Sequence, residues 1–169
     1  IDIPVEKFWE DKGDQAGLRP SEVEVQLVAN DQDVVGQKRT LLPVNNWKDE
    51  FKNVPKFDPD GKLIRYTVKE LNPPAEYVVT VTGDSSGDAS LGFSITNSYV
   101  PEVVRLPVKK KWLGPAADSV KVQLLGRLDD AEPYEDVPGA VLTLTKDEGW
   151  QGSFENLPKL KEGKLVSYA

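Results

Sequence analysis

The chain has 169 residues, enough for one domain or two small ones, and its apolar fraction of 38% is ordinary for a protein with a packed core. Its formal net charge is −7, and the acidic residues are spread along the sequence. This balance argues against nucleic acid and anionic membrane surfaces as partners. No apolar stretch approaches the roughly 20 residues that span a bilayer, so we expect no membrane insertion in this segment.

Cysteine, histidine and methionine are all absent from the sequence. The absence of cysteine excludes disulfides, thiol catalysis and zinc–thiolate sites. The absence of histidine removes the commonest general base and the commonest metal ligand. The sequence therefore predicts no metal site and no cofactor, and it argues against a conventional turnover enzyme. Any chemistry would have to come from carboxylates, lysines or amides.

A short motif near the start of the chain occurs a second time later in the sequence. Residues 5–9 return as residues 108–112, each time after an apolar residue and a proline. Further matches follow in the same order, and ordered matches of this kind indicate a tandem duplication. The later pairs are residues 23–27 with 120–124, 47–55 with 150–158, and 61–66 with 163–168.

Short stretches of alternating apolar and polar residues, separated by turn residues, predict an all-β sandwich, and no segment has a sustained helical period. The first copy continues through expected strands at residues 66–70, 77–82 and 92–99. The second copy stops at Ala169, within the equivalent of the strand at 66–70. We therefore expect two tandem β-sandwich domains, residues 1–102 and 103–169, with the second domain truncated at its C-terminal end.

Three expected strands of the first copy each place one polar residue on the inward face. Side chains alternate between the two faces of a strand, so a polar residue that lies between inward apolar residues also points inward. This phasing assigns Lys7, Glu70 and Asn97 to the core side. The apolar residues that set the phase are Val5 and Trp9 on the first strand, Tyr66 and Val68 on the second, and Phe93, Ile95 and Tyr99 on the last.

The residues alone leave two interpretations of this trio open. The simpler one is a buried Lys7–Glu70 salt bridge with Asn97 hydrogen-bonded nearby, since buried charges are normally paired. In the second, apolar surroundings favour the neutral amine and the neutral carboxyl together. A neutral Lys7 amine is a nucleophile that can attack the carboxamide of Asn97, with Glu70 polarising its carbonyl. The products are an amide cross-link and one ammonia.

The motifs together resemble the Cna B-type domains, repeated modules of Gram-positive surface adhesins and pilins. The resemblance implies an inverse immunoglobulin-like β-sandwich. It also implies an autocatalytic, single-turnover isopeptide bond between Lys7 and Asn97, promoted by Glu70 as the catalytic carboxyl. The matching segments are residues 5–9, 19–27, 47–55, 66–70 and 95–99 in the first copy and the corresponding front part of the second.

This resemblance implies a structural stalk function outside the cell, on the cell wall of a Gram-positive bacterium. The implied partners are neighbouring domains of the same surface protein, with a host extracellular ligand possible through other domains. The alternative is a module that itself binds host protein or carbohydrate. An exposed aromatic patch would favour that alternative, and Phe8 is the outward aromatic residue that the phasing identifies.

The second copy carries Lys110 at the position equivalent to Lys7, which makes it a candidate cross-link lysine. We expect Lys110 to face the interior of its domain, and the glutamate and asparagine that it would need lie beyond Ala169. A further acidic segment, residues 58–61, has the residue types of a calcium loop but lacks the spacing of an EF-hand. We expect residues 58–61 to form a turn.

Overall fold

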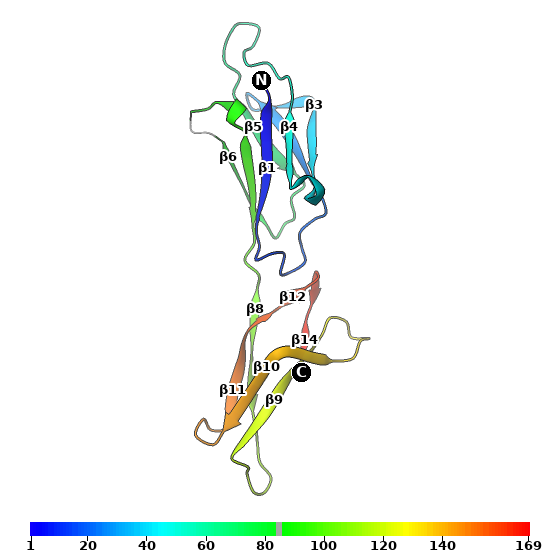
Figure 1. Cartoon of the computed structure of the whole chain (residues 1–169), viewed down its shortest axis with the longest axis vertical. Coiled ribbons are helices and arrows are strands. Elements are labelled where there is room, and N and C mark those ends of the chain that lie inside the picture. The colour runs from blue at the N-terminus through cyan, green and yellow to red at the C-terminus, as the bar shows by residue number, and fades with distance from the viewer. Residues whose placement is uncertain (84–85) are drawn as a thin grey trace. The chain divides into compact units, whose positions relative to one another are not determined.

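The first part of the chain folds into two β-sheets that face each other across an apolar core (Figure 1). The computed structural model describes residues 1–83 and 86–169. One sheet has the strand order β4-β1-β7-β6 and the other the order β3-β2-β5. Their elements are β1 (Ile3–Glu10), β2 (Val23–Ala29), β3 (Gln32–Leu41), η1 (Pro43–Asn45), β4 (Lys48–Phe51), β5 (Tyr66–Leu71), β6 (Val78–Gly83), η2 (Ala89–Leu91) and β7 (Phe93–Ser98).

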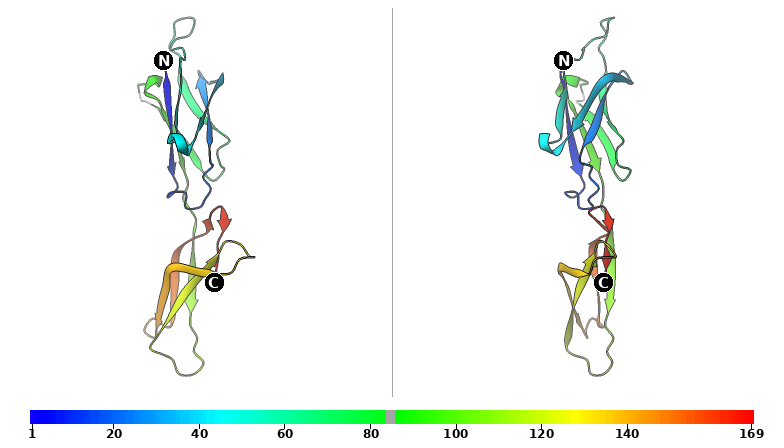
Figure 2. Two further views of the ribbon diagram at one scale, coloured as in Figure 1. Left: turned by 45° about the vertical axis from the view of Figure 1, so that its right-hand side comes forward. Right: turned by 90° about the vertical axis from the view of Figure 1, so that its right-hand side faces the viewer.

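The first and last strands of this part lie next to each other. β1 pairs with β7 in parallel and with β4 in antiparallel orientation. The turned views in Figure 2 keep β1, in blue, beside the green strands β6 and β7. Parallel neighbours need a long connection, and here the whole of β2–β6 supplies it.

The core of the sandwich comes from the inward positions of both sheets. Burial along β1 alternates as the sequence predicts, with Val5 at 2% and Lys7 at 3% exposed while Phe8 is 44% exposed. Burying the apolar face of each sheet against the other is the main stabilising contribution of such an arrangement. The fully enclosed apolar residues include Ile3, Val25, Leu27, Leu41, Phe51 and Ile95.

The rest of the chain builds a second, smaller set of sheets. Contacts divide the chain into a first unit, residues 1–13 and 19–100, and a second unit, residues 14–18 and 101–169. In the second unit β9 lies between β10 and β14, β8 pairs with β11, and β12 pairs with β13. The strands are β8 (Val103–Lys109), β9 (Ser119–Arg127), β10 (Glu135–Thr145), β11 (Gln151–Pro158), β12 (Leu160–Lys161), β13 (Lys164–Leu165) and β14 (Ser167–Tyr168).

Matching hydrogen bonds in the two units confirm the tandem duplication. The backbone N–H of Lys7 donates to the carbonyl of Trp47 at 2.9 Å, and Lys110 donates to Trp150 at 2.8 Å. The Tyr66 hydroxyl donates to the carbonyl of Pro55, and that of Tyr168 donates to Pro158, both at 2.7 Å. Equivalent residues thus have equivalent backbone partners, which chance sequence similarity would not produce.

A buried glutamine repeats in the same way. The side-chain amide of Gln26 donates to the carbonyls of Leu27, Val34 and Gln37, at 2.7, 2.8 and 3.0 Å. The contacts lie where the β2–β3 pairing shifts register after Gln26. Backbone carbonyls left unpaired by a bulge need another partner when buried, and the glutamine supplies it. Gln123 does the same in the second unit, donating to Leu124, Val137 and Ala140.

Residues 58–61 form a turn, as expected. Asp58 accepts hydrogen bonds at its side chain from the backbone N–H groups of Asp60 and Lys62, at 3.0 and 2.8 Å. Gly61 donates to the carbonyl of Asp58 and has a φ of +77°, a conformation that favours glycine. Within the described residues, no group of three or more acidic, histidine or cysteine side chains could hold a metal ion.

Candidate functional site

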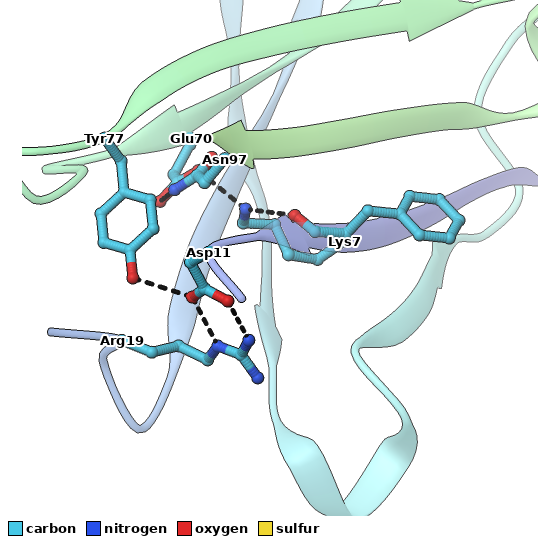
Figure 3. A network of polar contacts seen from close by, with 7 residues as sticks. Lys7, Asp11, Arg19, Glu70, Tyr77 and Asn97 are labelled. Carbon is cyan, nitrogen blue, oxygen red and sulfur yellow. Dashed lines mark hydrogen bonds and ion pairs between the residues drawn. The ribbon is translucent and has the colours of Figure 1, made fainter. Parts of the chain in front are cut away.

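Three polar side chains from three strands meet inside the first unit (Figure 3). The amide nitrogen of Asn97, on β7, donates a hydrogen bond to Glu70 Oε1 at 3.0 Å. Glu70, on β5, brings its Oε2 to 3.8 Å from the Nζ of Lys7, on β1. All three side chains are buried, since the exposed fraction is 3% for Lys7, 0% for Asn97 and 2% for the Glu70 side chain.

Strand register explains how the trio assembles. In the parallel β1–β7 pair, Lys7 is opposite Ile95 and Trp9 is opposite Asn97. Lys7 and Asn97 therefore point to the same inner face as diagonal neighbours, a separation that a long lysine side chain can bridge. Glu70 comes from the facing sheet, where β5 pairs with β2. The predicted inward phase of all three residues is confirmed by their burial.

Burial lowers the pKa of Lys7 from its usual 10.5 to about 8, because the apolar surroundings disfavour the ammonium form. The Glu70 carboxylate opposes this shift, Arg19 adds to it, and Asp11 opposes it. Nζ donates one hydrogen bond, to the carbonyl of Phe8 at 3.1 Å, and lies 3.8 Å from the centre of the Trp9 ring. At pH 7 about a tenth of Lys7 would thus be neutral, far more than for an exposed lysine with its usual pKa of 10.5.

Two acceptor oxygens of the trio, Glu70 Oε2 and Asn97 Oδ1, accept no hydrogen bond among the described residues, although Oε2 lies in the 3.8 Å ion pair with Lys7 Nζ. Buried acceptors without donors are costly and call for an explanation. The oxygen and nitrogen of an asparagine amide are assigned from their surroundings, so the Asn97 amide can also be placed with Oδ1 towards Glu70. In that orientation Oδ1 would face the Glu70 carboxyl, the group expected to polarise the amide carbonyl for attack by the nearby amine.

An ion pair next to the trio was not anticipated from the sequence. Asp11 follows β1 and is 2% exposed. It accepts from Arg19 Nε at 3.0 Å, from a second Arg19 nitrogen, and from the Tyr77 hydroxyl at 2.9 Å. Continuing the inward alternation of Val5, Lys7 and Trp9 by one step would have placed Asp11 on the same face, so a signal for it was present.

Aromatic rings enclose this end of the site. Trp9 packs edge-to-face against Trp47 and Tyr77, with ring centres 5.3 Å apart in both pairs. Tyr77 in turn lies 5.6 Å from Tyr99. Rings in this arrangement exclude water and keep the local dielectric low, which favours the neutral form of the Lys7 amine.

Lys110 makes the same backbone bond as Lys7, to Trp150 instead of Trp47, but its side chain is exposed whereas that of Lys7 is buried. Strand β8 ends at Lys109, one residue before it. Its Nζ lies 4.9 Å from the ring of Trp112, which packs edge-to-face on Trp150. Among the described strands β8 pairs with β11 alone, whereas β1 has β4 and β7 on its two sides. Lys110 is exposed because the described part of the second unit lacks a strand at the β7 position to cover it.

The fold and the contacts repeated in both units define the class of protein. It is an all-β protein built from tandem inverse immunoglobulin-like sandwiches, as the sequence predicted. The chain belongs to the Cna protein B-type domain family, which matches residues 3–98 and 106–169 and confirms the resemblance noted in the sequence. Within the described residues, no helix is long and apolar enough to cross a membrane.

The chain is 34% identical to the collagen adhesin of Staphylococcus aureus, over 98% of this chain and 13% of the adhesin. It thus spans about an eighth of that relative's length. The crystal structure of two B repeat units (B1B2) of the S. aureus collagen binding protein superposes with a TM-score of 0.71 at 28% identity, covering 99% of this chain and 43% of that one. The crystal structure of a single B repeat unit (B1) of the same S. aureus protein gives a TM-score of 0.49 at 30% identity. The match covers 100% of this chain and 83% of that one. The chain is therefore a Cna B-type segment similar to the repeat region of a staphylococcal adhesin.

Proposed function

We propose that this chain is a structural stalk module of a bacterial surface adhesin, made rigid by an isopeptide bond between Lys7 and Asn97. The observation that carries the proposal is the buried contact of Lys7, Glu70 and Asn97. A structural salt bridge between Lys7 and Glu70 alone gives no reason for a buried Asn97 Oδ1 without a donor beside an amine whose pKa is lowered to about 8. A site that forms a bond requires the neutral amine, the polarised amide and the absence of water.

The reaction uses only groups that the chain supplies. The lone pair of neutral Lys7 Nζ attacks Asn97 Cγ, while protonated Glu70 hydrogen-bonds the amide oxygen on which negative charge develops. The new Nζ–Cγ bond forms, the Cγ–Nδ2 bond breaks, and a proton from Nζ ends on the leaving nitrogen. One ammonia departs and Glu70 recovers its proton. This is a single turnover on the chain itself, so the module is not a turnover enzyme.

The position of the bond suits a load-bearing module. It would join β1 to β7, the first and last strands of the first unit, which lie side by side and parallel. Tension that enters through β1 would pass directly into β7, and residues 8–96 would lie outside the path of the load. In the chain-entropy description, a covalent staple closing a loop of this length contributes roughly 4–5 kcal/mol.

Similarity to a surface adhesin supports a place outside the cell for this chain, attached to the cell wall of a Gram-positive bacterium. Residues 1–102 and 103–169 would act as two domains in series with neighbouring domains of the parent protein as partners. Exposed apolar side chains on the outer face of the first unit's sheet give little support to host binding by this segment. Phe8 and Val78 are 44% and 69% exposed, and polar Thr96 and Ser98 of β7 occupy the intervening strand.

Intact mass of the purified chain tests the proposal. We expect the chain to be lighter than its sequence by one ammonia, and a tryptic digest to contain a branched peptide in which Lys7 is joined to Asn97. The matched control is Lys110→Ala, which removes the exposed lysine of the second unit and should leave the ammonia loss unchanged. A wild-type mass equal to the sequence mass would show that the trio is only a salt bridge.

A further inference from the structure

The carboxylate of Asp11 accepts hydrogen bonds from three side-chain groups of Arg19 and Tyr77. Arg19 Nε donates to Oδ2 at 3.0 Å, and a second guanidinium nitrogen donates to Oδ1. The Tyr77 hydroxyl donates to Oδ2 at 2.9 Å. The Asp11 side chain is 1% exposed, whereas that of Arg19 is 25% exposed. A forked guanidinium contact of this kind fixes both oxygens of a carboxylate and neutralises its charge.

This pair faces the reacting amine. Asp11 and Arg19 come from the connection between β1 and β2, and both act on the charge of Lys7. Asp11 raises the pKa of Lys7 while Arg19 lowers it, so the two contributions oppose each other. The other charged group that faces Lys7 is Glu70 on β5. The neighbour of Lys7 on β7 is the neutral side-chain amide of Asn97. From the segment before β4, the carbonyl of Trp47 accepts a hydrogen bond from the backbone N–H of Lys7.

We propose that Arg19 is a positioning residue for cross-link formation: by occupying both oxygens of Asp11, it prevents that buried carboxylate from becoming a second counter-ion to Lys7. The inference rests on the proposed isopeptide bond. If Arg19 were absent, Asp11 would keep the Tyr77 hydroxyl bond but lose its guanidinium partner, and its negative charge would act on Lys7 without the opposing charge of Arg19. Lys7 would then stay an ammonium ion, which has no lone pair for attack.

The second unit agrees with a paired role for these residues. Counting from the matched tryptophans Trp9 and Trp112, Asp11 corresponds to Gly114. Counting from the matched strands β2 and β9, Arg19 corresponds to Ala116. The second unit therefore lacks counterparts of both Asp11 and Arg19, and in that unit the equivalent lysine, Lys110, is exposed.

A purely structural role for the pair makes a different prediction from an electrostatic one. If Arg19 and Asp11 only close the end of the pocket, losing either should slow bond formation at every pH, and losing both should be at least as harmful. If Arg19 controls the charge of Lys7, the two single substitutions should move the pH dependence in opposite directions. Removing both charges together should then cancel the effect.

The experiment follows ammonia loss by mass spectrometry as the full chain refolds. Chain recovered unfolded in denaturant at acid pH is diluted into buffers between about pH 6 and about pH 9.5, which bracket the rise in neutral amine. The variants are Arg19→Gln, Asp11→Asn and the double substitution. Arg105→Gln is the matched control, because Arg105 pairs with Glu155 at an exposed site in the second unit. Far-ultraviolet circular dichroism shows whether each variant folds.

For Arg19→Gln we expect the rate near neutral pH to fall about tenfold or more and to recover at alkaline pH, because an unpaired carboxylate favours the ammonium form. Asp11→Asn should shift the profile towards acid pH, and the double variant should regain the wild-type profile. If Arg19→Gln does not fold, the pH profile of bond formation in Asp11→Asn tests the inference instead, and it should be shifted towards acid pH. Unshifted profiles in the folded variants would overturn the inference, whereas wild-type chain that never loses ammonia would overturn the cross-link itself.

Discussion

Asn97 lies two residues beyond the register partner of Lys7 on the parallel strand next to it. Their side chains share the inner face of the sheet, and Glu70 approaches both from the opposite sheet. Diagonal neighbours on adjacent strands lie within reach of a long side chain but not of two short ones. The pairing of a lysine with an asparagine therefore suits this position, and the chemistry of the pair can be tested one group at a time.

The role of Glu70 is tested by Glu70→Gln, which keeps the shape of the side chain but removes the acid. We expect bond formation to slow by about 10²–10⁴-fold, because a general acid that polarises the amide contributes about that much. Time-resolved intact mass during refolding measures this directly. Glu50→Gln, at a partly exposed carboxyl paired with Lys52, is the control and should behave as wild type. Complete ammonia loss in Glu70→Gln at the wild-type rate would assign the chemistry to another group.

Asn97→Ala leaves Lys7 unbonded and should make stability depend on pH. The pKa of Lys7 is lowered from 10.5 to about 8 in the folded chain, so the folded state releases this proton first as pH rises. The free energy of unfolding of the first unit should therefore increase between pH 8 and pH 10.5, by at most about 3 kcal/mol. Urea titrations across this range measure it.

The control for that experiment is Asn97→Ala combined with Lys7→Met, which removes the titrating amine. Its stability should show no rise that is specific to this pH range. A rise of equal size in both variants would mean that groups other than Lys7 cause it.

Gly92, just before β7, sets how closely that strand approaches β1. Its φ is +86°, and a Cβ added there would lie 2.8 Å from the carbonyl oxygen of Pro4. We expect Gly92→Ala to destabilise the first unit by about 2–4 kcal/mol and to slow cross-linking, since β7 carries Asn97. Gly61→Ala is the control, because Gly61 has a similar φ with no atom within 4 Å. Equal effects of the two substitutions, measured by thermal unfolding, would show that close approach to Pro4 does not matter.

The repeated glutamines offer a matched pair of variants. Gln26→Leu should destabilise the β2–β3 hairpin by about 1–3 kcal/mol, because the carbonyls of Leu27, Val34 and Gln37 lose their donor. Gln123→Leu should do the same to the β9–β10 hairpin. Hydrogen exchange followed by mass spectrometry should localise each effect to its own unit. Faster exchange in both hairpins after one substitution would contradict the view that each glutamine serves its own bulge.

The local pattern of apolar and polar residues in the sequence was enough to predict the duplication, the all-β class and the inward faces of β1, β5 and β7. Each follows from short-range periodicity, because alternation along one strand reports which side a residue faces. For that reason the sequence alone identifies Lys7, Glu70 and Asn97 as inward polar residues. The long strands β3 and β10 were harder to foresee, since each includes a glycine, charged residues and an irregularity in its pairing.

Only the tertiary structure decided which inward residues meet. Alternation assigns a face but no partner, and the parallel pairing of β1 with β7 joins segments almost 90 residues apart through long-range packing. The same limit explains the two differences at the site. Asp11 lies in an apparent loop, yet Arg19 and Tyr77 converge on it and make it part of the core. Lys110 has the sequence phase of Lys7 but is exposed, because burial requires neighbouring strands to cover a residue, and β8 has β11 as its partner among the described strands.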